Sequence, residues 1–590
     1  MGPFFRRESM RTPTAAAWLL LLSAFLVSCE NPGKPSRRPA LPGLLELAPL
    51  EPPRPDWDSL AAGGDTVLAR REHDYVARRG VDWPLREVAP LLAGADGALC
   101  NLECCVALGG FPAVKGEANP CYFRARPEML RVITRAGIDM VTAANNHGAD
   151  YGPLSAAETL RWTREAGLVC AGLGLDLAQA GKPVLVRVGR TRVALAAMDT
   201  TMPSFIAGRN RPGVNHVPEG DLEIFEDRVR RLGEWARGRC DLLILTIHWG
   251  RNWDRETSAV HRKMARIAFH SGVDLILGHS AHRLQGVEIV DGKMVVYDMG
   301  NLLLDGIYKE PGKMGGVFLF RISPKGVHRL EIHPTQVLAA HTVRPKPAEA
   351  WRTLREMADL CRALGTELEL RRSPRWGPVG VIRAPIPRAT PRPPVGKGVV
   401  FRRFPATREF SPTRNEAALV EGLPGGAVEL DPPWKAAPGV ELLGYRLPSR
   451  ADEGTILYVH TWWRVTKRVK APWLVSLEIL DLEGRIFRTA WYNRHDPADW
   501  TLPLRQMKPG EIVEDFYPAR LGRAVPPGTY QIRALVLDPR KGPGGRLGPA
   551  LQLGTFRVES LEWKGPSGPE KEAAERARGG SAKGYGGAEG

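Results

Sequence analysis

Short apolar runs alternate with amphipathic runs between residues 61 and 370, and this alternation limits the fold more than any other feature of the chain. The apolar runs have the length of strands, whereas the amphipathic runs place apolar residues at i, i+3 and i+4, as helices do. We expect strands at Asp65–Ala69, Gly97–Leu102, Ile138–Ala144, Arg192–Met198, Asp241–His248, Val273–Gly278, Met294–Asp298 and Gly316–Ile322. We expect helices at Pro127–Ala136, Leu154–Ala166, Leu222–Arg237, Glu256–Ser271 and Ala348–Leu364. The pattern predicts a layered α/β domain over residues 61–370.

The chain changes character after residue 370. Residues 371–400 are rich in arginine and proline and contain no acidic residue, so we expect a basic, extended linker there. Between 401 and 562, β-type runs are separated by turn sequences without a helical pattern, which predicts an antiparallel β-sandwich. Residues 563–590 are rich in glycine, alanine and charge, and we expect them to be disordered.

The predicted β-sandwich contains several tryptophans on its strands, which have two interpretations. Aromatic side chains at alternating strand positions usually face the core, and a binding surface for a carbohydrate or polymer is the alternative. We expect the core position for Trp462, Trp463, Trp473 and Trp491.

The N-terminal residues have the layout of a bacterial lipoprotein signal. Arginines precede an apolar run, Ala15–Val27, that is shorter than the ~20 residues of a membrane-spanning helix. The run leads into the sequence LVSC, which resembles a lipobox and ends at Cys29. We expect removal of residues 1–28, lipid on Cys29 and a proline-rich tether over 29–60. An ordinary signal peptide with an incidental Cys29 is the alternative.

Composition and charge restrict the classes of molecule that the chain can bind. The 590 residues are 43% hydrophobic, which excludes a fully disordered chain. Lys+Arg number 82 against 65 Asp+Glu, and the formal net charge of +17 points to an anionic partner. We expect no nucleic acid, because the chain has an export signal and no recognised nucleic-acid-binding motif.

The remaining cysteines lack the paired CxxC spacing of a thiolate zinc site. In an oxidising compartment Cys121 could pair with Cys104 or Cys105, and free thiols are the alternative. The cysteine pattern leaves both open.

Polar side chains occur at or just after the ends of the predicted strands. They are two carboxylates, one amide and four imidazoles: Asp65, Glu103, Asn146, His147, His248, His279 and His282. Because ligands bind outside the carboxyl ends of strands in an α/β sheet, we expect these groups to share one crevice. Each is common alone, but together they form the ligand set of a two-metal hydrolytic site.

The order GD, NLE, ANNH with DYG, HWG, GHxxH and a final GN resembles the CapA-type poly-γ-glutamate capsule synthesis proteins. That family is similar in fold to the calcineurin-like metallophosphatases, and the resemblance covers about residues 61–340. It implies a four-layer α-β-β-α sandwich that binds divalent metal, with Mn, Fe, Zn and Mg as the candidate ions.

Matched by position, the resemblance also implies residue roles. Asp65 and His282 would bind the first metal, and Glu103 would bridge two metals. The second metal would be bound by Asn146, His248 and His279, and His147 would be the general acid. Classical phosphatases carry a histidine where this chain has Val67, so a mononuclear or weakly binuclear site is expected.

Two functions from different classes follow. The first is a metal-dependent hydrolase acting in the synthesis or export of an anionic, poly-γ-glutamate-like capsule polymer. The alternative is a non-catalytic polymer-binding or assembly factor that keeps the phosphatase fold. Either protein would be an exported lipoprotein, on the outer face of the cytoplasmic membrane or in the outer membrane. Its partners would be the membrane, the polymer and other capsule-synthesis proteins.

Overall fold

The structure is a computed structural model. It describes residues 48–115, 120–305, 312–385, 414–452, 456–487, 494–495, 497–498, 500–520, 526–541 and 545–559. Cys29, the expected signal peptide, Trp491 and the expected C-terminal tail lie outside these ranges.

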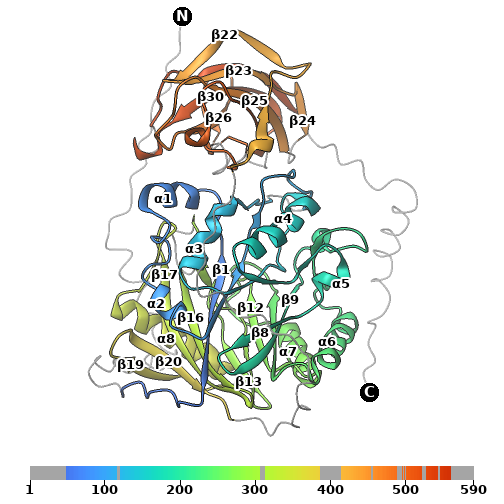
Figure 1. Ribbon diagram of the computed structural model, residues 1–590, viewed down its shortest axis with the longest axis vertical. Helices are drawn as coiled ribbons and strands as arrows, with labels where there is room; N and C mark the ends of the chain where they lie inside the picture. The colour runs from blue at the N-terminus through green and yellow to red at the C-terminus, as the bar shows by residue number, and fades with distance from the viewer. Residues whose placement is uncertain are drawn as a thin grey trace, which may run out of the picture. The chain divides into compact units, whose positions relative to one another are not determined.

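The first part of the chain, residues 48–385, is mixed α/β, as expected, and contains two large sheets (Figure 1). The larger sheet has ten strands in the described residues. Eight follow in order: β19 (Glu369–Ser373), β20 (Gly377–Arg383), β17 (Gly326–Val337), β16 (Met314–Ser323), β1 (Asp58–Thr66), β2 (Gly97–Leu102), β5 (Met140–Thr142) and β6 (Val169–Ala171). Two short strands join it: β15 (Asn301–Leu303) pairs with β1, and β18 (Thr342–Val343) pairs with β17.

The second large sheet has six strands in the described residues. Their order is β13 (Val287–Val290), β14 (Lys293–Val296), β12 (Leu275–His279), β11 (Leu242–His248), β9 (Thr191–Asp199) and β8 (Val184–Val188). In both sheets the central strands are parallel: β1, β2, β5 and β6 in the first, and β9, β11, β12 and β14 in the second. Two further strand pairs are β3 (Cys105–Val106) with β4 (Arg124–Ala125) and β7 (Leu173–Gly174) with β10 (Gly213–Val214).

Helices lie between many of these strands along the chain. They are α1 (Glu72–Arg79), α2 (Ala89–Leu92), α3 (Leu130–Arg135), α4 (Gly152–Glu165), α5 (Leu177–Ala180), α6 (Leu222–Ala236), α7 (Ala259–His270) and α8 (Pro347–Ala363). Single 3₁₀ turns occur at Pro127–Met129, Pro203–Phe205, Glu416–Ala418, Leu504–Gln506 and Pro539–Lys541. Capping side chains fix where α6 and α7 begin. The side chains of Asp221 and Ser258 accept hydrogen bonds from the backbone N–H groups of Ile224 and His261.

The two large sheets have separate hydrophobic clusters. One combines side chains of β1, β2 and β16 with those of α2, α3 and α4. The other combines β9, β11 and β12 with α6 and α7, which lie side by side (Figure 1). The amphipathic faces predicted for α6 and α7 are therefore buried against the second sheet, with Phe225, Val229 and Met264 among the enclosed residues.

The first strand differs from its prediction. We expected Asp65–Ala69, but β1 is Asp58–Thr66, so that Asp65 stands near its carboxyl end. The residues before Asp65 are mostly small, and a run of alanine and glycine has little hydrophobic signal. The structure needs small residues there, because the backbone of Gly300 lies directly against Gly64.

The predicted linker also differs from the structure at its start. Residues 371–383 are largely taken up by β19 and β20, which extend the first sheet beyond β17. The arginines of this stretch are accommodated at the sheet edge, where Arg371 and Arg383 both pair with Glu369. Residues 386–400 of the predicted linker lie outside the described ranges.

The C-terminal part, from residue 414 to 559, is rich in strands. One sheet has the order β21 (Leu419–Val420), β29 (Ile512–Arg520), β25 (Ile456–Val465), β23 (Val440–Arg446) and β22 (Val428–Ala437). The other has the order β24 (Arg450–Asp452), β31 (Leu551–Glu559), β30 (Gly528–Leu537), β26 (Leu474–Leu480) and β27 (Ile486–Phe487), with β28 (Arg494–His495) on β26. One hydrophobic cluster draws on both sheets.

The tryptophans of this part are buried or pack against the hydrophobic cluster where they are described. Trp462 and Trp463 are fully buried, and Trp473 packs against the shared cluster. The core interpretation is therefore confirmed for Trp462 and Trp463, and a surface made of these two side chains is excluded.

The described residues contain neither the disulfide that the sequence left open nor a membrane-spanning helix. No disulfide joins Cys121 to Cys104 or Cys105 in this part of the chain. No helix among the described residues has both the length and the apolar character needed to cross a bilayer.

Because β1 lies close to the connection between β14 and β15, substitution by alanine should destabilise the protein much more at one glycine than at another. A Cβ atom at Gly64 would lie 1.8 Å from the carbonyl oxygen of Gly300, and that backbone cannot yield without moving Asp65. Gly64→Ala should lower the free energy of unfolding by about 3 kcal/mol or more, measured by denaturant unfolding of the full chain. Gly422, which has no heavy atom within 4 Å of a built Cβ, is the matched control. Equal stability of the Gly64→Ala and Gly422→Ala variants would contradict the packing described here.

Candidate metal centre

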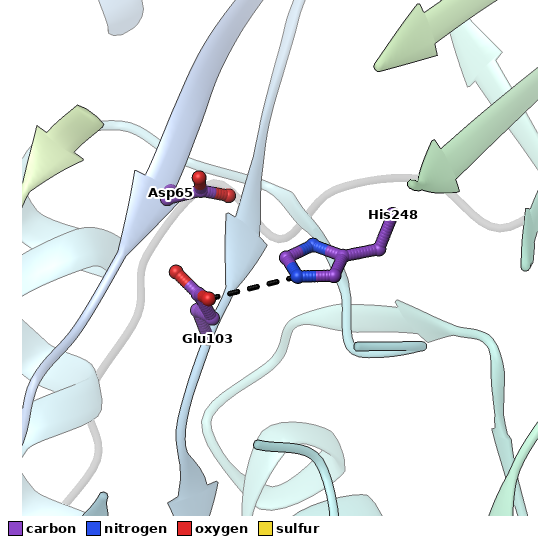
Figure 2. A group of neighbouring side chains, drawn as sticks. All are labelled: Asp65, Glu103 and His248. Carbon is purple, nitrogen blue, oxygen red and sulfur yellow. Dashed lines mark ion pairs between the residues drawn. The ribbon is translucent and has the colours of Figure 1, made fainter. Parts of the chain in front are cut away.

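Asp65, Glu103 and His248 bring three ligand atoms together in the interior. The three atoms lie within 4.8 Å of one another, and all three residues are buried. Figure 2 shows their side chains directed toward a common point, and the dashed line marks the 3.7 Å contact between His248 Nε2 and Glu103 Oε1. A carboxylate pair with an imidazole is a donor set that divalent transition metals accept.

The two sheets place these residues by their topology. Asp65 stands near the carboxyl end of β1 and Glu103 follows β2, whereas His248 ends β11 in the second sheet. Parallel register places His248 level with His279 of β12 and Asp199 of β9. The carboxyl ends of both sheets therefore meet at one place, as the strand-end pattern predicts.

Two further histidines belong to the same cluster. His279 Nδ1 lies 3.7 Å from Asp65 Oδ1, and His282 Nδ1 lies 3.1 Å from Asp65 Oδ2. His282 Nε2 is also 3.7 Å from Glu103 Oε1. Five of the predicted site residues, Asp65, Glu103, His248, His279 and His282, are thus gathered around one point.

Several polar atoms of this cluster are buried without a hydrogen-bond partner among the described residues. They are both carboxylate oxygens of Glu103, Nε2 of His248 and both ring nitrogens of His279. Oδ1 of Asn146, on the segment after β5, is likewise buried without a hydrogen-bond partner among the described residues. Buried polar atoms are almost always satisfied, because an unpaired one costs about 1–3 kcal/mol. The concentration of such atoms here fits a cation that would take their lone pairs.

The charges of the cluster follow from burial and mutual contact. Burial opposes ionisation of Asp65, but the hydrogen bond and charge of His282, together with His248 and His279, hold the pKa of Asp65 well below its usual value. Burial and the charge of Asp65 raise the pKa of Glu103 well above its usual range.

Burial lowers the pKa of His248, and it lowers the pKa of His279 to about 4. Both imidazoles are therefore neutral at pH 7, which is the form that binds metal. Burial also opposes the charge of His282, but Glu103 and Asp65 raise the pKa of His282 to about 10.

Neighbouring polar groups hold the cluster in place. Asn101 Nδ2 donates to Asp65 Oδ1 at 2.8 Å, and Asn145 Nδ2 donates to Asn101 Oδ1 at 3.0 Å. Asp298 accepts the backbone N–H groups of Ala281 and Gly300, both at 2.7 Å, and so joins the loop after β12 to the start of β15. These contacts orient the candidate ligands in the way that outer groups orient the ligands of known metal sites.

The loop after β12 has an unusual backbone. Ser280 has φ of 106° and His282 has φ of 55°, both in the left-handed region that residues with a side chain rarely adopt. Strained backbone of this kind concentrates at functional sites, where surrounding structure enforces it. Here the contacts of His282 with Asp65 and with Asn301 Oδ1, at 3.1 and 3.0 Å, keep the side chain turned into the cluster.

Asn146 and His147 follow β5 and form a second group around a buried lysine. Lys115 Nζ donates to Asp150 Oδ1 at 2.8 Å and to the Asn146 carbonyl at 2.7 Å, and both charged side chains are fully enclosed. His147 Nδ1 lies 2.6 Å from Asp150 Oδ2. Lys115 therefore fixes both the backbone of Asn146 and the carboxylate that holds His147.

The protonation of this second group follows from the same contacts. Burial opposes ionisation of Asp150, but His147 and Lys115 lower the pKa of Asp150 below its usual value. Burial lowers the pKa of His147 to about 3. A neutral His147 beside an ionised Asp150 carries its proton on Nδ1, because a carboxylate only accepts.

Comparison with known proteins agrees with this geometry. Residues 59–306 match the family model described as bacterial capsule synthesis protein PGA_cap, which spans β1 to the end of β15 and includes every residue of the cluster. This part of the chain is therefore similar to the bacterial capsule synthesis proteins.

Individual relatives extend the match. The chain is 24% identical over 302 residues to the capsule biosynthesis protein CapA of Bacillus anthracis, covering 51% of this chain and 72% of that protein. It is 25% identical over 288 residues to the PGA biosynthesis protein CapA of Bacillus subtilis, covering 48% and 72%. A probable polyglutamine synthesis accessory protein of Mycobacterium tuberculosis is 30% identical over 230 residues, covering 38% of this chain and 60% of that protein.

Sequence reasoning identified the candidate ligands of this α/β domain but missed the residues that support them. Lys115 lies in a loop without a recognisable pattern, and only its distance from Asp150 in the folded chain reveals it. Asp150 and Asp298 had a weak signal, because Asp150 begins the DYG motif and Asp298 is the last residue of a predicted strand just before GN. Cys29 lies outside the described residues.

The enclosed Lys115–Asp150 pair predicts a large loss of stability when its cation is removed. Lys115→Met leaves the Asp150 carboxylate buried without its charge partner, which should cost about 3–5 kcal/mol of unfolding free energy. Arg161→Ala, which breaks an exposed pair with Glu165 on α4, should cost about 0.5 kcal/mol or less. Denaturant unfolding of both variants measures the difference, and equal costs would contradict the enclosed pair.

Proposed function

We propose that the α/β domain is a metal-dependent hydrolase acting in the synthesis or export of an anionic, poly-γ-glutamate-like capsule polymer. One observation carries the proposal: Asp65, Glu103 and His248 direct buried ligand atoms toward one point, and the carboxylate oxygens of Glu103 and Nε2 of His248 have no hydrogen-bond partner in the described part of the chain. The names of the relatives support the capsule context.

The proposed ion is divalent, with Mn, Fe, Zn or Mg as candidates, because the donors are carboxylate oxygens and imidazole nitrogens. Asp65, Glu103, His248, His279 and His282 would hold it, with Asn146 as a further ligand. A bound ion of this kind supplies Lewis-acid polarisation of the bond to be cleaved, in a phosphoester or an amide of the polymer.

The residues of the chain have separable tasks in this proposal. Asn101 orients Asp65, and Asp298 orients the loop that carries His279 and His282. His147 is the proposed proton-transfer residue, and Asp150 fixes its tautomer. Since burial lowers the pKa of His147 to about 3, the free protein holds it as a proton acceptor, and the general-acid role requires a proton taken up during turnover.

The finer architecture and location belong to the same proposal. We propose that the two large sheets and their helices form the four-layer arrangement of metallophosphatases, and that residues 401–562 are an accessory β-sandwich. Lipid on Cys29 would hold the protein on the outer face of the cytoplasmic membrane or in the outer membrane. Other capsule-synthesis proteins are the proposed partners there.

A second function has its own support. The net charge of +17 attracts a polycarboxylate without any chemistry, so the chain could bind or guide the polymer as a non-catalytic export factor. The unpaired ligand atoms favour the hydrolase, because a polymer-binding surface does not need them. Metal content and turnover separate the two functions.

Metal content should follow the cluster. The purified full chain should contain divalent ion by elemental analysis, and Glu103→Gln and His248→Ala should each lower occupancy about tenfold or more. His147→Gln should leave the metal content nearly unchanged while removing hydrolysis of a chromogenic phosphodiester or shortening of the polymer. Chelation should lower the unfolding free energy by about 3 kcal/mol, because at ~100 times its Kd an ion that binds only the folded state contributes that much. Wild-type occupancy in both ligand variants would refute the site.

Membrane attachment should depend on one residue. Cys29→Ala should move the protein from the membrane fraction to the soluble fraction, because Cys29 is the proposed site of lipid attachment. Cys121→Ala, a second cysteine change, should leave the distribution as in the wild type. Retention of the Cys29→Ala protein in membranes after a salt wash would contradict lipid anchoring.

A further inference from the structure

A groove runs beside α4, α5 and α6, away from the proposed ligands. Three adjoining cavities of about 640, 350 and 480 Å³ form it. The first and second share Lys182 and Trp235, and the second and third share Arg228 and Arg231. We call it the α4–α6 groove; its helices are coloured teal to green in Figure 1.

The middle of the α4–α6 groove is strongly basic. Lys182, Arg228 and Arg231 line the second cavity, and no acidic residue is among its described lining residues. Arg164 lines the first cavity.

Most of these cations have no acidic partner among the described residues. In the described part of the chain Arg164, Lys182 and Arg228 have no carboxylate within ion-pair distance, whereas Arg231 pairs with Asp227 at 2.9 Å. Acidic side chains do line the outer cavities: Asp176 in the first, and Glu223 and Asp227 in the third. Cations without a carboxylate partner are available to bind an anion.

A buried hydrogen-bond acceptor lines the same middle cavity. Asn215 is 2% exposed, and its Oδ1 has no hydrogen-bond partner among the described residues. Its Nδ2 donates to the carbonyl of Ala197 at 2.8 Å, which fixes the orientation of the amide. The free atom is therefore an acceptor, and it calls for a ligand with an N–H group.

Apolar side chains complete the lining. Met198, Leu232 and the half-buried Trp235 lie in the middle cavity beside the basic groups. Such surfaces pack against methylene segments, while the cations and Asn215 address carboxylate and amide groups. A chain that repeats carboxylate, amide and methylene groups matches all three kinds of lining.

We infer that the α4–α6 groove binds an amide-linked polycarboxylate chain, with carboxylates on Lys182 and Arg228 and an amide N–H on Asn215. A polyphosphate has no N–H for Asn215, and a neutral polysaccharide has no charge for the cations. That this chain is the polymer processed at the metal centre rests on the proposed function.

The backbone connects the groove with the candidate metal centre. The backbone carbonyl of Asn215 accepts the backbone N–H of Asp199. The next residue, His216, contacts Asp199 Oδ2 at 2.8 Å through Nδ1. Asp199 stands level with His248 in the second sheet. A polymer in the groove would therefore lie against a segment that adjoins the metal centre, without using any of its proposed ligands.

Binding of defined polymers to the full chain tests the inference. The probes are poly-γ-glutamate, polyacrylate and polyphosphate of similar charge, measured by calorimetric titration at ~150 mM salt. Lys182→Gln/Arg228→Gln should weaken poly-γ-glutamate binding about tenfold or more. The matched control, Arg237→Gln/Lys263→Gln, removes two exposed cations that have no ion pair among the described residues and should change binding less than about twofold.

Each outcome decides the inference. Equal losses in the two double variants would overturn it, because the polymer would then respond only to net charge. Polyacrylate or polyphosphate binding as tightly as poly-γ-glutamate would also overturn it, because neither offers an N–H to Asn215.

The Glu103→Gln chain separates this inference from the proposed function. Its groove is unchanged, so poly-γ-glutamate should bind as in the wild type even though the metal centre is impaired. Loss of binding in Glu103→Gln would overturn a separate groove. Absence of hydrolysis by the wild type would refute the proposed function and leave the groove result standing.

Discussion

The fold depends on burying Asp65, Glu103 and their histidine neighbours where the carboxyl ends of two sheets meet. Taking a carboxylate out of water costs several kcal/mol unless opposite charge or hydrogen bonds compensate it. Asp65 receives compensation from His282 and Asn101, but the carboxylate oxygens of Glu103 and the ring nitrogens of His279 accept or donate no hydrogen bond among the described residues. The hydrophobic cluster on each sheet stabilises the fold against this desolvation cost, and a cation bound between these groups would offset the cost directly.

Much of the surrounding structure serves to keep this crowded centre in shape. Glycines at positions 64 and 300 let two backbone segments approach to the distance at which Asp65 N–H reaches the carbonyl of Gly300, at 3.0 Å. On the other side, Lys115 and Asp150 form an enclosed ion pair that orders the segment carrying Asn146 and His147. The two supports are independent, because they act on different loops.

The periodicity of the sequence predicts the elements near the centre well, because parallel strands and amphipathic helices have distinct patterns. Gly97–Leu102 is found as predicted, and α6 and α7 agree to within a few residues. The pattern fails where burial is achieved without large apolar side chains. β1 is built mainly of alanine and glycine before Asp65, and β19 holds its arginines at a sheet edge through ion pairs with Glu369. β17 carries Arg329, Glu331 and His333 on one face, and the buried pair of Arg329 and Glu331 makes that face compatible with the interior.

The sequence predicts the candidate ligands more completely than the bounds of the strands, because ligand chemistry restricts which residue types can occur at strand ends. Asp65, Glu103, His248, His279 and His282 do converge. The sequence does not reveal Lys115 or the unpaired buried acceptor of Asn215, because both depend on loops whose paths only the folded chain defines.

Diffraction from crystals of the full chain grown with Mn²⁺, recorded on either side of the manganese absorption edge, tests the central claim most directly. The account predicts an anomalous peak within coordination distance of Asp65, Glu103 and His248. A structure at full Mn²⁺ in which those atoms contact only ordered water, with no anomalous peak between them, would contradict it.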